Sequence, residues 1–112
     1  MAESKPVITY EEFQRLDLRI AEVMAAERVP NTEKLLKLTV NDGQGQRVIV
    51  AGIATHYRPE ELVGRKIVLL ANLQPARIRG IESQGMLLAA GEGAIISLLQ
   101  PDQDVPPGTV VR

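Results

Sequence analysis

The sequence predicts a small all-β domain with short helices, and three observations support this fold class. Apolar and polar residues alternate over short stretches such as 36–40, which is the pattern of half-buried strands. Turn signals separate these stretches, and Asp42-Gly43 is the strongest of them. The 112 residues are 45% hydrophobic and include no cysteine, so one core without disulfides is expected.

The first predicted element is a short helix that follows Thr9. Thr9 and Glu12 have the spacing of a capping box, which marks a helix start. Three apolar residues recur at helical spacing and are expected to face inward: Tyr10, Phe13 and Leu16. The stretch 17–27 alternates at first and then slips out of phase, which predicts a bulged and bent strand.

The remaining elements are mostly strands. They are predicted over 36–40, 47–51, 66–72, 77–79, 86–90, 95–99 and 105–111. A helical turn is expected to start at Pro59. Strands 77–79 and 86–90 are expected to pair around the turn Ser83-Gln84-Gly85.

About five main strands and a small helix favour a five-stranded OB-fold barrel with extra C-terminal strands. Residues 9–112 are predicted to form this single domain. A flexible N-terminus, residues 1–8, is expected to precede it.

Charge is distributed unevenly along the chain, although the net charge is only −1. Residues 34–79 hold eight basic and three acidic groups, a net charge of +5. The flanking stretches 1–33 and 80–112 each carry a net charge of −3. A basic middle between acidic ends predicts one positive face, unless these charges are merely solvated strand edges.

Arg77 and Arg79 are the first candidates for anion binding. They lie two residues apart, so on a strand both side chains point to one face, where their guanidinium groups can grip phosphate oxygens. Lys34 and Lys37, at the start of another strand, extend the predicted patch. Arg19 is expected on the outer face of the first strand, while Arg47 and Arg58 are taken as ordinary surface. The alternative is that Arg77 and Arg79 only protect an edge strand from aggregation.

Aromatic residues are scarce, and this narrows the kind of nucleic acid that the domain is expected to bind. Single-strand binders stack bases on aromatic side chains. The chain has only Tyr10, Phe13 and Tyr57, and the first two are predicted in the core. Binding is therefore expected to rest on phosphate contacts and on the shape of a folded RNA.

Several motifs resemble one known family. The matching stretches are DLRIAEV (17–23), NTEKLLKLTV (31–40), VIVAGIATHY (48–57), PEELVGRKIVLLANLQPARIRGIESQGMLLAA (59–90) and PPGTVV (106–111). Together they resemble the tRNA-binding domain at the C-terminus of bacterial methionyl-tRNA synthetases. The same domain occurs as a β-type subunit, as a free-standing homodimeric tRNA-binding protein, and within the endothelial monocyte-activating polypeptide group.

The resemblance implies an OB fold, recognition of tRNA by shape, and no catalytic activity, so no cofactor is expected. It places Asn72, Ser83, Gly85 and Met86 on the binding face and dimer contacts in the segment after Ile95. From the residues alone, Asn72 equally suits capping its own turn, and Met86 equally suits the core. The partners implied are tRNA, a second copy of the chain, and a methionyl-tRNA synthetase.

Other readings of the sequence stay open. A chaperone of the CsaA type, which binds unfolded or exported polypeptides, shares the fold, although that branch departs from the Ser-x-Gly-Met-x-x-Ala-Ala pattern seen here. The chain is expected to be a free-standing protein, a synthetase subunit or an excised domain.

Enzymatic and membrane functions are not expected. No nucleophile is placed beside a base, and His56, the only histidine, has no evident second metal ligand, so neither a catalytic nor a metal site is predicted. No stretch approaches the roughly 20 apolar residues of a membrane helix. A cytoplasmic location is expected.

Overall fold

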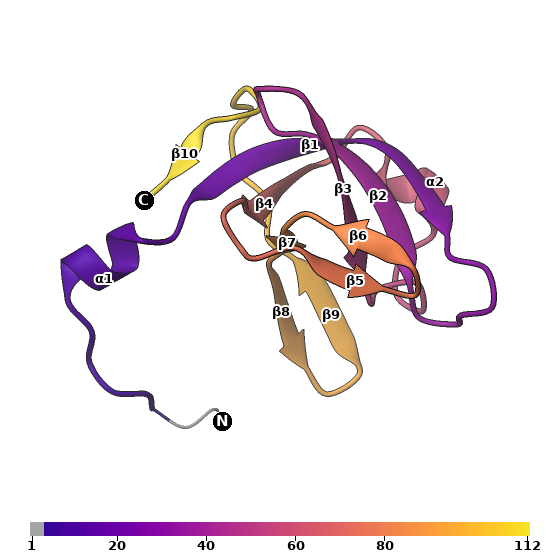
Figure 1. Ribbon diagram of the computed structural model, residues 1–112, viewed down its shortest axis with the longest axis horizontal. Helices are drawn as coiled ribbons and strands as arrows, with labels where there is room; N and C mark the ends of the chain where they lie inside the picture. Colours follow the sequence, from indigo (N-terminus) through magenta and orange to yellow (C-terminus); the bar gives the residue numbers. More distant parts are fainter. Residues whose placement is uncertain (1–3) are drawn as a thin grey trace.

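The computed structural model describes residues 4–112, which form a curled antiparallel sheet with two additional hairpins (Figure 1). Its helices are α1 (Tyr10–Gln14) and α2 (Pro59–Leu62). Its strands are β1 (Leu18–Arg28), β2 (Leu36–Asn41), β3 (Gln46–Ala51), β4 (Lys66–Leu70), β5 (Ala76–Ile78), β6 (Ile81–Ser83), β7 (Met86–Leu87), β8 (Ala89–Glu92), β9 (Ile95–Leu98) and β10 (Val110–Val111). The all-β prediction is confirmed, and the division into residues 1–8 and 9–112 stays a prediction.

The long strand β1 organises the sheet, whose order is β3-β2-β1-β4-β7. Its first half pairs with β4 and its second half with β2, and β10 pairs with its start. The register shifts between Val23 and Ala25, so the predicted bulge is present. A bulge bends a strand and increases its local twist, so the two halves of β1 can pair with different strands of a curled sheet.

Side chains and one backbone–backbone hydrogen bond, rather than a regular ladder, close the barrel between β3 and the segment that leads into β7. The Val50 backbone N–H donates to Ser83 Oγ at 2.9 Å. The Gln84 backbone N–H donates to the Val48 carbonyl at 2.8 Å, and Val48 N–H donates to Gln84 Oε1 at 3.2 Å. The circuit β1-β2-β3-(83–87)-β4 therefore gives the five-stranded barrel of the OB type, as predicted.

The main core fills this barrel. Its most deeply buried side chains lie on the inner face of the sheet: Leu36, Leu38, Val40, Ile49, Ile67 and Leu69. Leu62 of α2 is also fully buried against them. Each such side chain stabilises the fold by about 1.5–3 kcal/mol relative to an exposed position. This burial fixes the register of β2 and β3, because a slip by one residue would turn the apolar set outward.

Helix α1 forms as predicted, but its apolar side chains pack less than expected. The Thr9–Glu12 capping box is present. Phe13 is half-buried against an outer cluster built on Leu18 and Val68, whereas Tyr10 and Leu16 are exposed by 64% and 47%. The expectation that all three face inward is therefore wrong. The helix lies at the same end of the barrel as β10 (Figure 1).

The end of the chain adds less strand than predicted. Within 105–111 only Val110–Val111 forms a strand, because prolines occupy 106 and 107 and cannot donate to a ladder. Hairpin β8–β9 projects from the barrel (Figure 1).

Candidate nucleic-acid interface

Two loops meet at one side of the barrel and bring together cations that are distant in the sequence. The first is the β1–β2 loop, and the second is the tip of the β5–β6 hairpin. Between them lies a hollow of about 440 Å³, here called the loop hollow, lined by Asn31, Thr32, Glu33, Lys34, Leu35 and Arg79. In OB folds the corresponding loops flank the surface that binds oligonucleotides.

The hairpin that carries the arginines differs from the predicted one. β5 pairs with β6, not with 86–90, and the turn is Arg79-Gly80 rather than Ser83-Gln84-Gly85. Both turn residues have positive φ, 52° and 81°, which is the two-residue turn that matches strand twist. The expectation that Arg77 and Arg79 share one strand face is therefore wrong, since Arg77 lies on β5 and Arg79 at the tip.

Arg79 occupies a backbone conformation that favours glycine or asparagine. A left-handed conformation costs a residue with an ordinary side chain roughly 1–2 kcal/mol. Such local strain concentrates at functional sites. Here it lies at the tip of the hairpin and places Arg79 on the loop hollow, which Lys34 also lines.

A substitution at Arg79 tests whether its left-handed backbone conformation destabilises the protein. Arg79→Asn is expected to stabilise the protein by about 0.5–1 kcal/mol, because asparagine tolerates positive φ and Asn-Gly is the preferred pair for this turn. Thermal unfolding followed by circular dichroism measures the change. Arg77→Asn is the matched control, because it removes the same side chain from a strand and should give no gain. A lower melting temperature for Arg79→Asn would show that the arginine side chain stabilises the hairpin.

Three predicted cations are free of acidic partners within residues 4–112. Lys34, Arg77 and Arg79 have no carboxylate within 4.0 Å in this part of the chain. Arg77 Nη1 donates to the Gly80 carbonyl at 2.7 Å, which orients the side chain. Glu82 lies opposite Arg77 in the β5–β6 pair but forms no ion pair with it. Cations without an internal partner are the ones available to phosphate oxygens.

The other two predicted cations already have carboxylate partners. Lys37 lies 3.6 Å from Glu27 Oε1 on the neighbouring strand. Arg19 Nε donates to Asp17 Oδ1 at 2.6 Å, and Arg19 lies beside β10, away from the loop hollow.

Asn72 and Ser83, which the resemblance implies as RNA contacts, are engaged within the protein. Asn72 Oδ1 accepts from Asp17 N–H at 2.8 Å and its Nδ2 donates to the Arg15 carbonyl at 2.7 Å, so it links β4 to the segment after α1. Ser83 is 4% exposed, and its hydroxyl also donates to the Gly85 carbonyl at 3.2 Å.

Gly85 and Met86 differ from each other in accessibility. Gly85 is buried with φ of 132°, and a Cβ there would lie 2.9 Å from the Leu70 carbonyl oxygen, so only glycine fits. Met86 pairs with Leu70 and is 45% exposed, so it is not core filler. Met86 is the one of these four residues with a large exposed side chain that makes no internal hydrogen bond.

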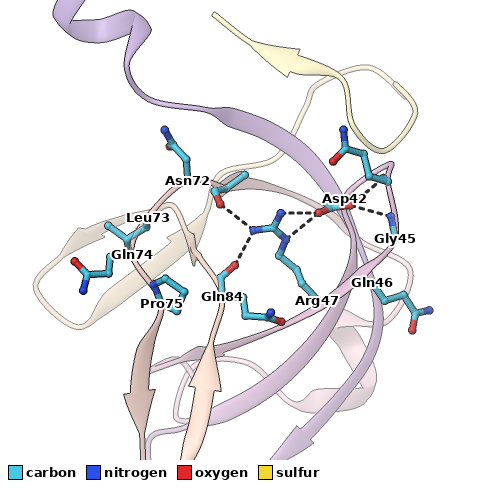
Figure 2. A pocket seen from close by; sticks show the side chains of 11 residues that line it. Asp42, Gly45, Gln46, Arg47, Asn72, Leu73, Gln74, Pro75 and Gln84 are labelled. Atoms are coloured by element: carbon cyan, nitrogen blue, oxygen red, sulfur yellow. Dashed lines mark hydrogen bonds and ion pairs between the residues drawn. The ribbon is translucent and has the colours of Figure 1, made fainter.

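Arg47 is central to a second hollow, which the sequence did not reveal. It pairs with buried Val40, so its side chain lies on the core face of β3 at the open end of the barrel. The guanidinium group donates to Asp42 Oδ2 at 2.8 Å and to the carbonyls of Ala71 and Gln84, both at 2.9 Å (Figure 2). The expectation that Arg47 is ordinary surface is wrong.

Asp42 completes this network. Burial of its carboxyl raises the pKa, but hydrogen bonds from Gln44 N–H and Gly45 N–H and the charge of Arg47 outweigh that effect and leave the pKa lowered. The pair lies at the floor of a hollow of about 510 Å³, here called the mouth hollow. Its other side chains include Gln44, Gln46, Leu73, Gln74 and Gln84.

Within residues 4–112 no group of three His, Cys, Asp or Glu side chains is placed to hold a metal ion. The ring nitrogens of His56 lie 3.1 Å from Thr55 Oγ1 and 3.1 Å from the Ala94 carbonyl. None of the helices in this part of the chain is long and apolar enough to cross a membrane.

Comparison with known proteins agrees with this geometry. The family model described as "Putative tRNA binding domain" matches residues 18–110. A methionine–tRNA ligase of Thermotoga maritima is 58% identical over 104 residues, which cover 93% of this chain and 16% of the ligase. A ligase of Deinococcus radiodurans is 53% identical over 112 residues, which cover 99% of this chain and 16% of that protein.

Solved structures give the same fold. A MetRS-related protein from Pyrococcus horikoshii superimposes with a TM-score of 0.91 at 37% identity, covering 96% of this chain and all of that one. The chaperone CsaA from Bacillus anthracis gives a TM-score of 0.87 at 34% identity, with the same coverage.

The chain therefore spans about a sixth of the length of the ligases it matches, and the matching part is a binding domain rather than a catalytic one. The family model covers most of the chain, and the barrel, its loops and the solved structures agree with it. The chain belongs to the tRNA-binding domain family related to the C-terminal domain of methionyl-tRNA synthetase.

Proposed function

We propose that this domain holds structured tRNA by its sugar–phosphate backbone, with the loop hollow and the β5–β6 hairpin as the contact surface. The observation that carries the proposal is that Lys34 and Arg79 line one hollow and Arg77 lies on the same hairpin as Arg79, while none of the three has a carboxylate within 4.0 Å in the described chain. Lys37 and Met86 extend this surface. Arg19, Asn72, Ser83 and Gly85 contribute indirectly, by keeping the strands and turns in place.

The absence of aromatic side chains from the loop hollow supports recognition of folded RNA. Tyr57 does not line this hollow: its hydroxyl accepts from Leu98 N–H at 3.1 Å, and the Arg65 guanidinium group lies 5.5 Å from its ring centroid. A surface of cations without stacking platforms reads the arrangement of phosphates, which differs between a folded tRNA and a flexible strand.

A binding titration tests this proposal. Total tRNA, a duplex RNA and a single-stranded RNA are titrated at four salt concentrations by fluorescence anisotropy. We expect tRNA to bind most tightly, and the logarithm of its association constant to fall linearly with the logarithm of salt concentration. Equal or tighter binding of the single-stranded RNA would contradict recognition by shape.

The similarity to CsaA supports a second candidate function, which is binding of unfolded polypeptides. The two functions differ in their dependence on salt. A chaperone surface would bind a reduced, unfolded substrate protein with little loss at high salt, and that substrate would compete with tRNA. The same titration with an unfolded protein therefore separates the two functions.

A homodimer is the second part of the proposal. The segment after Ile95 leaves apolar side chains exposed, among them Ile95 at 65% and Val110 at 51%. Leu16, which follows α1, is also exposed. Helix α1 lies at the same end of the barrel as β10, whereas Ile95 is in the β8–β9 hairpin, which projects elsewhere (Figure 1). Two copies joined through this end would present two cationic surfaces to one tRNA, which raises avidity without a new contact.

Light scattering measures the oligomeric state of the chain. We expect a dimer at micromolar concentration, and we expect Val110→Asp to give a monomer because the contact would then bury a carboxylate, while Arg19, which lies opposite it in the strand pair, is already bonded to Asp17. Val63→Asp is the matched control, since Val63 is a valine of similar exposure (52%) far from this end. A wild-type chain that stays monomeric at tens of micromolar would refute dimerisation through this surface.

The synthetase relation suggests the cellular role. We infer that the domain raises the local concentration of tRNA for a methionyl-tRNA synthetase in the cytoplasm, as a subunit or as a covalent part, and that it needs no cofactor. Attachment to the synthetase, covalent or as a subunit, would give bound tRNA a high effective concentration at the enzyme even if the domain's own affinity for tRNA is modest.

A further inference from the structure

We propose that the mouth hollow binds one unstacked nucleobase of the bound RNA, stacked on the flat face of Arg47. The inference rests on the proposed function, since the RNA that supplies the base is the one held at the hairpin. It adds a site for a single base to a surface that otherwise contacts phosphates.

The charges of the mouth hollow argue against a phosphate there. Among residues 4–112 its only charged lining residues are Asp42 and Arg47, and they form an ion pair with a distance of 2.8 Å. Because the two charges of this ion pair cancel, the hollow has no net positive charge that would attract a phosphate. A hollow of about 510 Å³ with no net charge and several amides is suited to a neutral, polar ligand.

Arg47 offers its flat face because its edge is already occupied. Nε donates to Asp42, and Nη1 donates to both Ala71 and Gln84 carbonyls. These bonds lie in the plane of the guanidinium group and hold it rigid at the floor of the hollow (Figure 2). Unstacked bases stack on arginine planes as they do on aromatic rings. A fixed guanidinium group therefore supplies the stacking platform that the scarcity of aromatic residues otherwise denies this domain.

The rim of the mouth hollow provides groups that read the edge of a base. The side chains of Gln44, Gln46 and Gln74 make no hydrogen bond within residues 4–112, and each carries a donor and an acceptor. In Figure 2 the side chains of Gln46 and Gln74 lie on either side of Arg47 at the rim of the hollow and extend away from the guanidinium group. Leu73, 43% exposed, and Pro75 add apolar surface beside Gln74.

The position of the mouth hollow fits a base from the same RNA. Pro75 precedes β5 and Gln84 follows β6, so the hollow lies at the base of the hairpin whose tip carries Arg79. Four to five residues of strand separate the two, roughly 15 Å at about 3.3 Å per residue. If the RNA backbone is bound at the hairpin tip, a nucleotide a short distance further along the RNA can therefore reach the mouth hollow.

Nuclear magnetic resonance with uncharged nucleosides tests the site directly. Adenosine, guanosine, cytidine and uridine are added separately at millimolar concentration to the ¹⁵N-labelled chain. We expect the Arg47 Nε–H signal to move upfield by the ring current of a stacked base, and the side-chain amide signals of Gln46 and Gln74 to shift with it. The signal of Gln103, exposed on another surface, should not move. No shift at Arg47 with any of the four nucleosides would overturn the proposal.

A variant tests the same site with tRNA. The triple substitution Gln44→Ala, Gln46→Ala and Gln74→Ala removes exposed side chains only and is expected to weaken tRNA binding about tenfold, with the salt slope unchanged because no phosphate contact is lost. Arg47→Lys keeps the charge but removes the plane, and a similar loss is expected if it folds. The control is Gln14→Ala with Gln103→Ala.

The outcomes distinguish this inference from the proposed function. A wild-type chain that shows the Arg47 shift but binds no tRNA would refute the function and leave the base site. A wild-type chain that binds tRNA while the triple variant binds equally well would refute the base site alone. A triple variant with a smaller salt slope would mean that the hollow contacts phosphate, which also overturns it.

Discussion

Replacing Lys34, Arg77 and Arg79 together by alanine is expected to weaken tRNA binding on the order of 100-fold at physiological salt. Each cation lacks an internal partner in the described chain, so each can release a counterion when it meets a phosphate. The slope of log K against log salt should therefore fall by about 2–3, because each contact contributes about 0.7–0.9. Anisotropy titration across salt concentrations measures both quantities.

The control removes equal charge elsewhere. Lys5, Arg58 and Arg112 are exposed and make no ion pair within residues 4–112, so their joint replacement changes the net charge by the same three units. It should leave most of the affinity intact. If both triple variants lose affinity equally, binding depends on total charge, and the loop hollow is not the contact surface.

Replacing Asp42 by alanine is expected to destabilise the protein by about 2–4 kcal/mol, near the lower end of the range for breaking a buried ion pair. Arg47 would lose its counterion where only 24% of its side chain is exposed. The loop N–H groups of Gln44 and Gly45 would lose their acceptor as well. Urea unfolding measures the loss, with Asp102→Ala, at an exposed residue without an ion pair, as control. A loss below about 0.5 kcal/mol would show that the network contributes little to folding.

The same pair predicts a dependence on pH. Because the folded-state pKa of Asp42 is lowered, its stabilisation is complete above the unfolded value of about 3.9 and is lost as pH falls through the folded value. The free energy of unfolding should therefore decrease below about pH 4 in the wild type, and less steeply in Asp42→Asn.

The sequence sufficed for the barrel because its determinants are local. Alternation with period two identifies strands such as β2, and Asp-Gly identifies the turn that joins it to β3. Two of the cations singled out in the sequence, Lys34 and Arg79, line one hollow, and their role in binding stays a prediction. Alternation does not predict which residues distant in the sequence come into contact. Both hollows of the candidate site are built from such contacts.

The hairpin error shows this limit. Ser83-Gln84-Gly85 has turn composition, but its side chains are used to close the barrel against β3. Arg79 was not expected in a turn, since arginine rarely adopts positive φ. The Gly80 that follows it was the available signal, because X-Gly is the usual pair in such turns.

Arg47 could have been found by extending the alternation of its own strand. It lies two residues before buried Ile49, so period two places it on the core face. A charged residue in that position requires a counterion, and Asp42 lies five residues earlier across the hairpin loop.

The barrel seam has a consequence for dynamics. Elsewhere the circuit is held by strand ladders, but β3 is joined to the next segment by one backbone–backbone hydrogen bond, from Gln84 N–H to the Val48 carbonyl, and by the side chains of Ser83 and Gln84. Fewer backbone bonds mean a smaller free energy of local opening, so Val48 and Val50 amides should exchange with deuterium before those inside the β1–β2 ladder. The Gln84 carbonyl also accepts a hydrogen bond from Arg47. A ligand bound on Arg47 should therefore make local opening of the seam less frequent.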